Sequence, residues 1–191
     1  GGVSLRKINY LGVYKMPKKA KITKAKKAPK KEAKPAVVEI KVVNIVVSTS
    51  LEHDIPLEKM AATLSNTEYN PEQFPGLVIR IKEPKSSALI FSSGKVVCTG
   101  ARSLEKVHES IKKIIKSLEK INIKITVEPK IKIQNIVASG SIGMDLNLNT
   151  LTMKLDNTEY EPEQFPGLVY KLPKAKATFL LFSNGKVVCT G

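Results

Sequence analysis

The sequence predicts an α+β protein in which two similar repeats each contribute an antiparallel sheet covered by helices. Three observations lead to this prediction. Residues 40–100 align with residues 131–191 at a constant offset and without a gap. Both copies contain short runs of β-branched residues divided by turn signals, which indicate antiparallel strands. A strongly amphipathic segment at 103–121 indicates a helix long enough to cover a sheet.

The similarity between the two copies is uneven along the repeat. Residues 66–100 and 157–191 share 23 of 35 residues, whereas 40–65 and 131–156 share 10 of 26. The most similar stretches are NTEYNPEQFPGLV and NTEYEPEQFPGLV. Two long copies indicate one pseudosymmetric object rather than a solenoid, whose repeats usually span about 20–50 residues. We therefore expect a first repeat at 37–121 and a second at 122–191.

Each repeat is expected to begin with a strand and a short helix. The strands are EIKVVNIVVS (39–48) and KIKIQNIVAS (130–139), which are rich in β-branched residues. The helices are PLEKMAATL (56–64) and NLNTLTMKL (147–155), which carry leucine and methionine at helical spacing. We expect Pro56 as a favourable first helical residue. A short TEY strand and an FPG turn follow in both copies.

The second half of each repeat is expected to be an antiparallel meander. In the first copy its strands are LVIRIK, SALIFSS and KVVCTG, divided by KEPK and SSGK. The helix at 103–121 follows, with Ser103 as its cap and Val107 and Ile111 on its apolar face. The sequence ends at Gly191, where the matching helix of the second repeat would begin. We therefore expect a second repeat that is truncated before its final helix.

Both faces of the predicted sheet are largely apolar. Strict alternation places Val43, Ile45 and Val47 on one face of the first strand, and Val42 and Asn44 on the other. Each repeat supplies helices for one face only, and a large exposed apolar surface is typical of a binding site. Two alternatives stay open at this point, namely that one repeat packs on the other or that the chain forms a homodimer.

The face without helices has a chemistry suited to the DNA minor groove. Amides and hydroxyls can read the groove's hydrogen-bond acceptors, apolar side chains can fill it, and basic side chains at the rim can meet phosphates. The expected rim residues are Arg80, Lys95, Lys171 and Lys186. Four phenylalanines form two equivalent pairs at turns and strand ends, and exposed wedges of this kind can unstack base steps. These are Phe74, Phe91, Phe165 and Phe182; core packing is the alternative for each.

The net charge of +15 is concentrated near the N-terminus. Residues 1–36 hold twelve Lys and Arg against one Glu, which is +11, and the remainder carries 15 − 11 = +4. We expect this basic segment to be disordered and to attract nucleic acid without sequence preference.

Several function classes lack a signal in this sequence. Cys98 and Cys189 both occur in KVVCTG and are expected to be core residues rather than a disulfide or metal pair, which is compatible with a reducing compartment. His53 and His108 are isolated, and we expect no metal, no cofactor and no enzyme activity. No apolar run is long enough for a membrane helix, and we expect neither membrane association nor a secretory signal.

The same three motifs occur in the same order in both repeats. In the first copy they are VNIVVS, EYNPEQFPGLV and LIFSSGKVVCTG, and in the second they are QNIVAS, EYEPEQFPGLVY and LLFSNGKVVCTG. This order resembles the TATA-box-binding proteins, and EPEQFPG is most similar to archaeal members. The resemblance covers residues 39–191 and implies a saddle, with one curved antiparallel ten-stranded sheet and helices on its convex face. Its concave face is implied to bind the minor groove of an A/T-rich promoter element. The family is itself a standard example of proteins that bend DNA with apolar wedges.

The resemblance assigns roles to individual residues of the concave face. It implies that the four phenylalanines are intercalating wedges, abutted by Pro75 and Pro166. The central amides and hydroxyls that face base edges are Asn44, Asn135, Thr99 and Thr190. The groove-filling residues are Val46, Val97, Val137, Val188, Leu89 and Leu180. The phosphate contacts are the four rim residues and Ser93, whose counterpart is Asn184.

The loop that carries NTEYxPEQFPG forms a stirrup at each end of the implied saddle. Glu161 and Glu163 of the second stirrup match acidic residues that bind transcription factor B, whereas the first stirrup has Asn70 and Glu72. We hypothesise that this charge difference helps partners to distinguish the two halves. The resemblance thus implies a general transcription initiation factor that recruits factor B and RNA polymerase. Its expected location is the cytoplasm, at the archaeal nucleoid, or the nucleus in a eukaryote.

Three rival functions are weighed beside this one. The basic segment alone would suit a non-specific architectural DNA- or RNA-binding protein. The saddle is also compatible with an accessory domain of an enzyme, although no catalytic constellation is visible. Finally, the apolar sheet would suit a protein-interaction module or a homodimer that forms off DNA.

Overall fold

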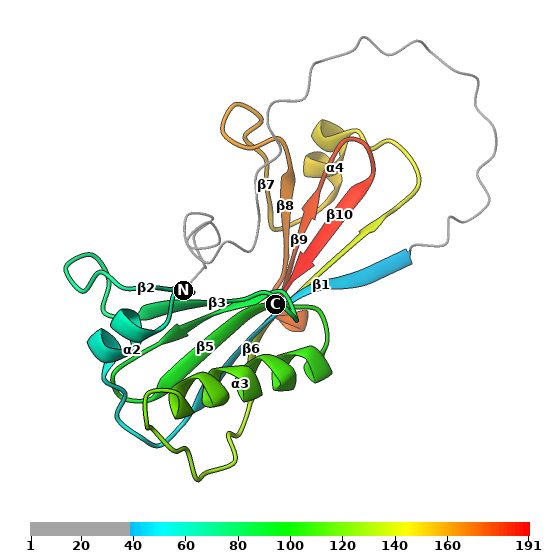
Figure 1. Ribbon diagram of the computed structural model, residues 1–191. Coiled ribbons are helices and arrows are strands. Elements are labelled where there is room, and N and C mark those ends of the chain that lie inside the picture. Colours follow the sequence, from blue (N-terminus) through cyan, green and yellow to red (C-terminus); the bar gives the residue numbers. More distant parts are fainter. Residues whose placement is uncertain (1–38) are drawn as a thin grey trace.

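The computed structural model describes residues 39–191, and the expected basic segment at 1–36 lies outside the described residues. Ten strands form one antiparallel sheet in the order β2-β3-β4-β5-β1-β6-β10-β9-β8-β7 (Figure 1). The strands of one repeat occupy each half of the sheet, and β1 pairs with β6 at the centre. The repeats therefore lie side by side, and the alternative in which one packs face to face on the other was wrong.

The first repeat follows the predicted order of elements. They are β1 (Glu39–Ser50), α2 (Leu57–Thr63), β2 (Thr67–Glu68), β3 (Leu77–Ile81), β4 (Ser86–Ile90), β5 (Lys95–Ala101) and α3 (Leu104–Glu119). Ser103 caps α3 as predicted, because its Oγ accepts the Lys106 N–H at 3.3 Å. Pro56 is the N-cap of α2 with ψ of 90°, so the prediction of a first helical residue was wrong by one position.

The second repeat runs through the equivalent elements. They are β6 (Lys132–Ser141), α4 (Leu148–Lys154), β7 (Thr158–Glu159), β8 (Leu168–Leu172), the 3₁₀ helix η1 (Pro173–Ala175), β9 (Ala177–Leu181) and β10 (Lys186–Thr190). The sequence did not predict η1, which begins at a proline, a residue whose fixed φ suits a first helical position. Asn147 caps α4, because its Oδ1 accepts the Thr150 N–H at 3.0 Å.

The main hydrophobic core lies between the helices of the first repeat and one face of its strands. Val107, Ile114 and Leu118 of α3 are fully buried in the same cluster as Cys98 and Ala101 of β5. Each such aliphatic side chain contributes about 1.5–3 kcal/mol on burial. Helices α3 and α2 both pack on this face, which is the convex face of the saddle. The opposite face is the concave one.

The convex core of the second repeat is smaller. Leu148 of α4 packs with Leu168, Leu181 and Val187 of the strands. Among residues 39–191 no helix follows β10. Ile136 is 37% exposed, whereas Ile45, the equivalent residue of the first repeat, is 5% exposed and belongs to the same cluster as the buried residues of α3.

Two β-bulges interrupt the pairing of the central strands. The register of β1 with β6 shifts between Val42 and Asn44 and again between Val46 and Val47. Val43 packs against the cluster on the face opposite the helices, whereas Ile45 and Val47 belong to the convex core. The expectation that Val43 shares a face with Ile45 was therefore wrong, because an extra residue at a bulge changes the alternation of side chains.

Candidate nucleic-acid interface

The concave face carries one apolar row in each repeat. Cα partners in neighbouring strands share a face, so Val78, Leu89 and Val97 form a row across β3, β4 and β5. The equivalent row of the second repeat is Val169, Leu180 and Val188, which cluster with Val137 and Phe165. The α-helices α2, α3 and α4 pack against the opposite face. The structure thus brings the expected groove-filling residues together and adds Val78 and Val169 to them. Strand alternation could have identified these two valines, because they lie two residues before Arg80 and Lys171 and so share their face.

The predicted central residues are also placed side by side. Asn44 Nδ2 donates to Thr99 Oγ1 at 3.0 Å, and Asn44 Oδ1 accepts the Gly100 N–H at 2.6 Å. Asn135 Oδ1 accepts from Thr190 Oγ1 at 3.1 Å and from the Gly191 N–H at 3.0 Å. In the β1–β6 pairing Asn44 is opposite Val137 and Asn135 is opposite Val46. Two amides and two valines therefore meet at the pseudo-two-fold centre of the face.

The hydrogen bonds of the two amides decide what they can offer a ligand. The Asn135 oxygen accepts from both the Thr190 hydroxyl and the Gly191 N–H, which occupies its two lone pairs and leaves its N–H donors free. The Asn44 oxygen accepts the Gly100 N–H, and one Asn44 N–H already donates to Thr99. Asn135 has both N–H bonds of its side chain available, because the structure gives Nδ2 no acceptor among residues 39–191. The minor groove presents acceptors at A·T pairs and an added donor, the guanine amino group, at G·C pairs. The centre of the face is therefore chemically matched to A·T pairs.

The four phenylalanines form two edge-to-face pairs with the same geometry. The Phe74–Phe91 and Phe165–Phe182 ring centroids are both 5.9 Å apart, with interplanar angles of 67°. Each pair joins a stirrup to the end of the fourth or ninth strand. The first-repeat pair is half-buried, whereas Phe165 is only 8% exposed. Aromatic pairs of this geometry contribute about 0.5–1.5 kcal/mol beyond area burial, so the rings support one another.

Turn hydrogen bonds hold the stirrup phenylalanines in place. The N–H groups of Phe74 and Phe165 donate to the carbonyls of Asn70 and Glu161, at 3.0 and 2.9 Å. Pro75 and Pro166 follow directly and are exposed. A glycine comes next in each copy, and a Cβ at Gly76 would lie 2.7 Å from Phe74 Cε1. The sequence reading treated FPG only as a turn and missed this close approach between glycine and ring.

The basic residues expected at the rim border the apolar rows, and two of them are paired with carboxylates. Lys95 and Lys186 are exposed at the edge of the face. Arg80 Nη2 lies 3.3 Å from Glu68 Oε2, and Lys171 Nζ forms the equivalent ion pair with Glu159 Oε1. Sequence reasoning missed both glutamates. Their role depends on the register of two-residue strands, for which the sequence gives no signal beyond the repeated TEY.

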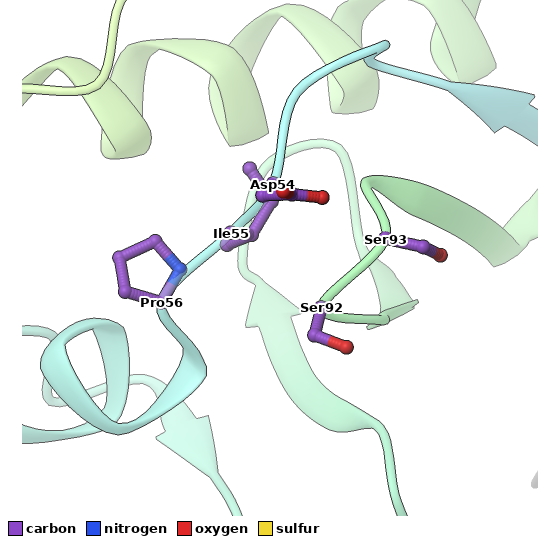
Figure 2. A pocket seen from close by; sticks show the side chains of 5 residues that line it. All are labelled: Asp54, Ile55, Pro56, Ser92 and Ser93. Carbon is purple, nitrogen blue, oxygen red and sulfur yellow. The ribbon is translucent and has the colours of Figure 1, made fainter.

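Ser93 lies on the β4–β5 turn at the edge of the sheet. Figure 2 shows that Ser92 and Ser93 line a pocket together with Asp54, Ile55 and Pro56 of the β1–α2 connection. The connection is tied to the turn by the Ile55 N–H, which donates to the Ser92 carbonyl at 2.8 Å. An exposed hydroxyl beside Lys95 is suited to a phosphate contact. Asn184 is equally exposed in the second repeat and can donate through its amide.

The four acidic or polar stirrup residues are exposed, namely Glu161, Glu163, Asn70 and Glu72. They lie away from the central amides, in the turns that follow β7 and β2. Their side chains are thus open to solvent.

Other chemistries have little support within residues 39–191. No group of three or more His, Cys, Asp and Glu residues there is arranged to hold a metal ion. The structure also describes no helix that combines the length and the apolar character needed to cross a bilayer. Cys98 and Cys189 are free thiols, the first buried and the second half-buried.

Together the fold and this face define a class of proteins: duplicated α+β saddles whose concave apolar face lies between two aromatic pairs and a basic rim. The family model described as "Transcription factor TFIID (or TATA-binding protein, TBP)" matches residues 39–121 and 130–191. The chain belongs to the TATA-box-binding protein family.

Archaeal relatives agree with this assignment. The chain is 51% identical over 154 residues to the TATA-box-binding protein of Archaeoglobus fulgidus, covering 80% of this chain and 84% of the relative. It is 54% identical over 153 residues to that of Methanocaldococcus jannaschii, again covering 80% and 84%. The solved structure described as Methanococcus jannaschii TBP matches with a TM-score of 0.74 and 54% identity, over 80% of this chain and 87% of that one.

Proposed function

We propose that this protein is a non-enzymatic transcription initiation factor that binds the minor groove of a TATA-box promoter element and bends the DNA. One observation carries the proposal most directly. An Asn–Thr–Gly arrangement occurs twice at the centre of an apolar concave face, and an edge-to-face phenylalanine pair closes each end. The names of the family and of its archaeal relatives support the same function.

The proposed mechanism uses each part of the face for a separate task. The phenylalanine pairs insert between base steps at the two ends of the element and open the minor groove. Flexible pyrimidine–purine steps such as TA are the least costly to deform, so part of the selectivity comes from shape. The central amides donate to the acceptors of A·T pairs, while a guanine amino group would oppose them. Each mismatched base pair is expected to cost about 1–3 kcal/mol.

The bent complex would then act as a platform for other proteins. We propose that transcription factor B binds the second stirrup through Glu161 and Glu163, and that RNA polymerase is recruited through it. The setting would be the cytoplasm, at the nucleoid of an archaeal cell. The test is a Glu161→Arg, Glu163→Arg double variant. If this variant recruited factor B as well as wild type does, the role proposed for the two glutamates would be contradicted.

The test of the DNA-binding function is bending, measured by fluorescence transfer between the two labelled ends of a duplex. One duplex carries TATAAA and a control carries a G/C substitution of it. We expect strong bending of the first duplex only, and we expect Phe165→Ala to reduce it. Binding without bending, or equal bending of both duplexes, would contradict the proposal.

The charge of +11 on residues 1–36 supports a second candidate, non-specific binding to DNA or RNA. Counterion release would then give sequence-independent binding with a steep salt dependence. Deleting residues 1–36 separates the two candidates. Loss of all binding would favour the basic segment, whereas retained selectivity for TATAAA would favour the saddle.

A further inference from the structure

Each outermost strand places one carboxylate on the concave face. Glu68 is the Cα partner of Val78, and Val78 is the partner of Leu89 in the apolar row. Glu159 has the same position beside Val169 and Leu180. Cα partners in an antiparallel sheet point to the same side, so both glutamates lie on the face that would meet DNA. An acidic group at both ends of a DNA-binding face is unfavourable unless it has a partner or a function.

Both glutamates have a cationic partner on the adjacent strand. Arg80 and Lys171 stand two residues beyond Val78 and Val169, and therefore on the same face. The contacts join Arg80 Nη2 to Glu68 Oε2 and Lys171 Nζ to Glu159 Oε1. The four side chains are 47–72% exposed, so both pairs are open to solvent and to a competing anion.

We propose that Glu68 and Glu159 compete with DNA phosphates for Arg80 and Lys171, and thereby limit the affinity of the concave face. This inference rests on the proposed function. A carboxylate and a phosphate both offer anionic oxygens to the same donors, so the two cannot both fully occupy one cation. Forming the phosphate contact then requires the ion pair to open, and it leaves a negative carboxylate beside the DNA backbone.

The two pairs are chemically unequal. An Arg guanidinium has five N–H donors in a fork and can keep one carboxylate contact while it offers other donors to a phosphate. A Lys ammonium is a single point of charge, and Lys171 is 47% exposed against 67% for Arg80. Competition should therefore be stronger in the second repeat, and relief of competition should be larger there.

The test is to convert each carboxylate to an amide in the full chain and to measure the Kd for a TATAAA duplex at about 0.1 M salt. We expect Glu159→Gln to tighten binding about 2- to 5-fold and Glu68→Gln somewhat less, in line with the strength of exposed ion pairs. The gain should be equal for TATAAA and a G/C-substituted duplex, because phosphate contacts carry no sequence information. It should fade near 1 M salt, where charges are screened over about 3 Å.

A matched control separates local competition from overall charge. Glu109 is an exposed residue of α3, on the convex side of the sheet, and Glu109→Gln makes the same change of charge there. We expect it to alter the Kd less than either concave-face variant. A gain equal to that of Glu159→Gln would show a general effect of net charge and would overturn the proposal.

A double-mutant cycle then distinguishes competition from simple repulsion. If Glu159 acts by holding Lys171, the gain from Glu159→Gln should shrink when Lys171 is already Gln. An undiminished gain would mean that the carboxylate only repels DNA. Weaker binding by Glu159→Gln would mean that the pair positions Lys171 for DNA, and either result would overturn competition. If the wild-type protein did not bind the TATAAA duplex selectively, the proposed function itself would be refuted instead.

Discussion

The side chains of Asn44 and Thr99, 55 residues apart in the sequence, meet at an Nδ2–Oγ1 distance of 3.0 Å in the centre of the concave face. Asn135 and Thr190 repeat this contact through Oδ1 at 3.1 Å. In both repeats the amide oxygen also accepts the N–H of the glycine after the threonine. The protein therefore fixes the orientation of both amides before any DNA arrives, which lowers the conformational entropy lost on binding.

The first prediction concerns the charge at this centre. Asn135→Asp keeps an oxygen that accepts the Gly191 N–H, so the fold should be retained. It replaces the free amide donor with a carboxylate that faces base acceptors, and two acceptors repel each other. We expect the affinity for a TATAAA duplex to fall about 10- to 100-fold, which corresponds to about 1.4–2.8 kcal/mol. Fluorescence anisotropy measures the Kd.

Thermal unfolding provides the control for this variant. Asn135 is only half-buried, so the midpoint should stay close to that of wild type. A Kd within a factor of two of wild type would contradict the role of Asn135 as a donor to bases. A large fall in the unfolding midpoint would show that the residue has mainly a structural role.

The second prediction separates a wedge from a core residue at adjacent positions. Phe91 is half-buried on the concave face, and Ile90 is fully buried in the convex core. We expect Phe91→Ala to reduce DNA bending strongly while lowering the free energy of unfolding less than Ile90→Ala does. The latter should cost about 2–5 kcal/mol, because a large cavity is left in the core. Bending by fluorescence transfer and unfolding in urea measure the two quantities.

Equal bending by Phe91→Ala and wild type would remove Phe91 from the proposed mechanism. Its partner Phe74 offers an internal comparison, because the two rings form one edge-to-face pair. Loss of either ring should therefore have a similar effect on bending, and the double variant should add little.

Much of this fold follows from local patterns that the sequence displays openly. The β-branched runs, the FPG and SSGK turns and the 3.6-residue period of α3 predict the elements in order. The repeat at constant offset predicts pseudosymmetry, so a role assigned to Asn44 extends to Asn135. The apolar rows of the concave face follow from alternation along β4 and β5.

Features that depend on the pairing of distant strands did not follow from the local patterns of the sequence. Alternation fails at Val43 because a bulge in the β1–β6 ladder changes which side its side chain takes. The Glu68–Arg80 pair depends on the register of a two-residue strand. The side-by-side arrangement of the repeats depends on β1 pairing with β6, a contact that no local signal specifies. It was predicted only through the resemblance to the TATA-box-binding proteins, which implied one ten-stranded sheet, and the structure confirms it.

The third prediction is a pH dependence of stability that arises from Cys98. Burial raises the pKa of its thiol from 9.0 to about 11, and hydrogen bonds with Ser110 and Thr99 offset part of this effect. The folded state thus keeps the proton to a higher pH than the unfolded chain does. The stability linked to this thiol is fully present below pH 9 and is lost as the pH rises towards 11. The loss is about 1.4 kcal/mol per pH unit in that window.

The contribution of Cys98 is measured as a difference. The free energy of urea unfolding is compared between wild type and Cys98→Ala at pH 8, 9 and 10, so that other titrating groups cancel. We expect wild type to lose stability relative to the variant as the pH rises. Cys189 is less buried, and burial raises the pKa of its thiol in the same direction. A pH-independent difference would contradict the prediction.

The last prediction contrasts two glycines of the same repeat. Gly94 has a φ of +82°, and a Cβ there would lie 2.3 Å from the His53 carbonyl oxygen, which is backbone and cannot easily move. A Cβ at Gly76 would meet only ring edges, namely Phe74 Cε1 at 2.7 Å and Phe91 Cε1 at 3.2 Å. Gly94→Ala therefore places a side chain in the left-handed region of φ, which costs about 1–2 kcal/mol. It also displaces the segment that contains His53, which is held to Gly94 by the Leu51 N–H to Gly94 carbonyl hydrogen bond. We expect it to lower the free energy of unfolding by at least about 2 kcal/mol, measured in urea.

Gly76→Ala should cost much less stability but should shift the Phe74 ring and reduce DNA bending. If both variants lost stability equally, the close approach of Gly76 would serve the fold rather than the position of the wedge.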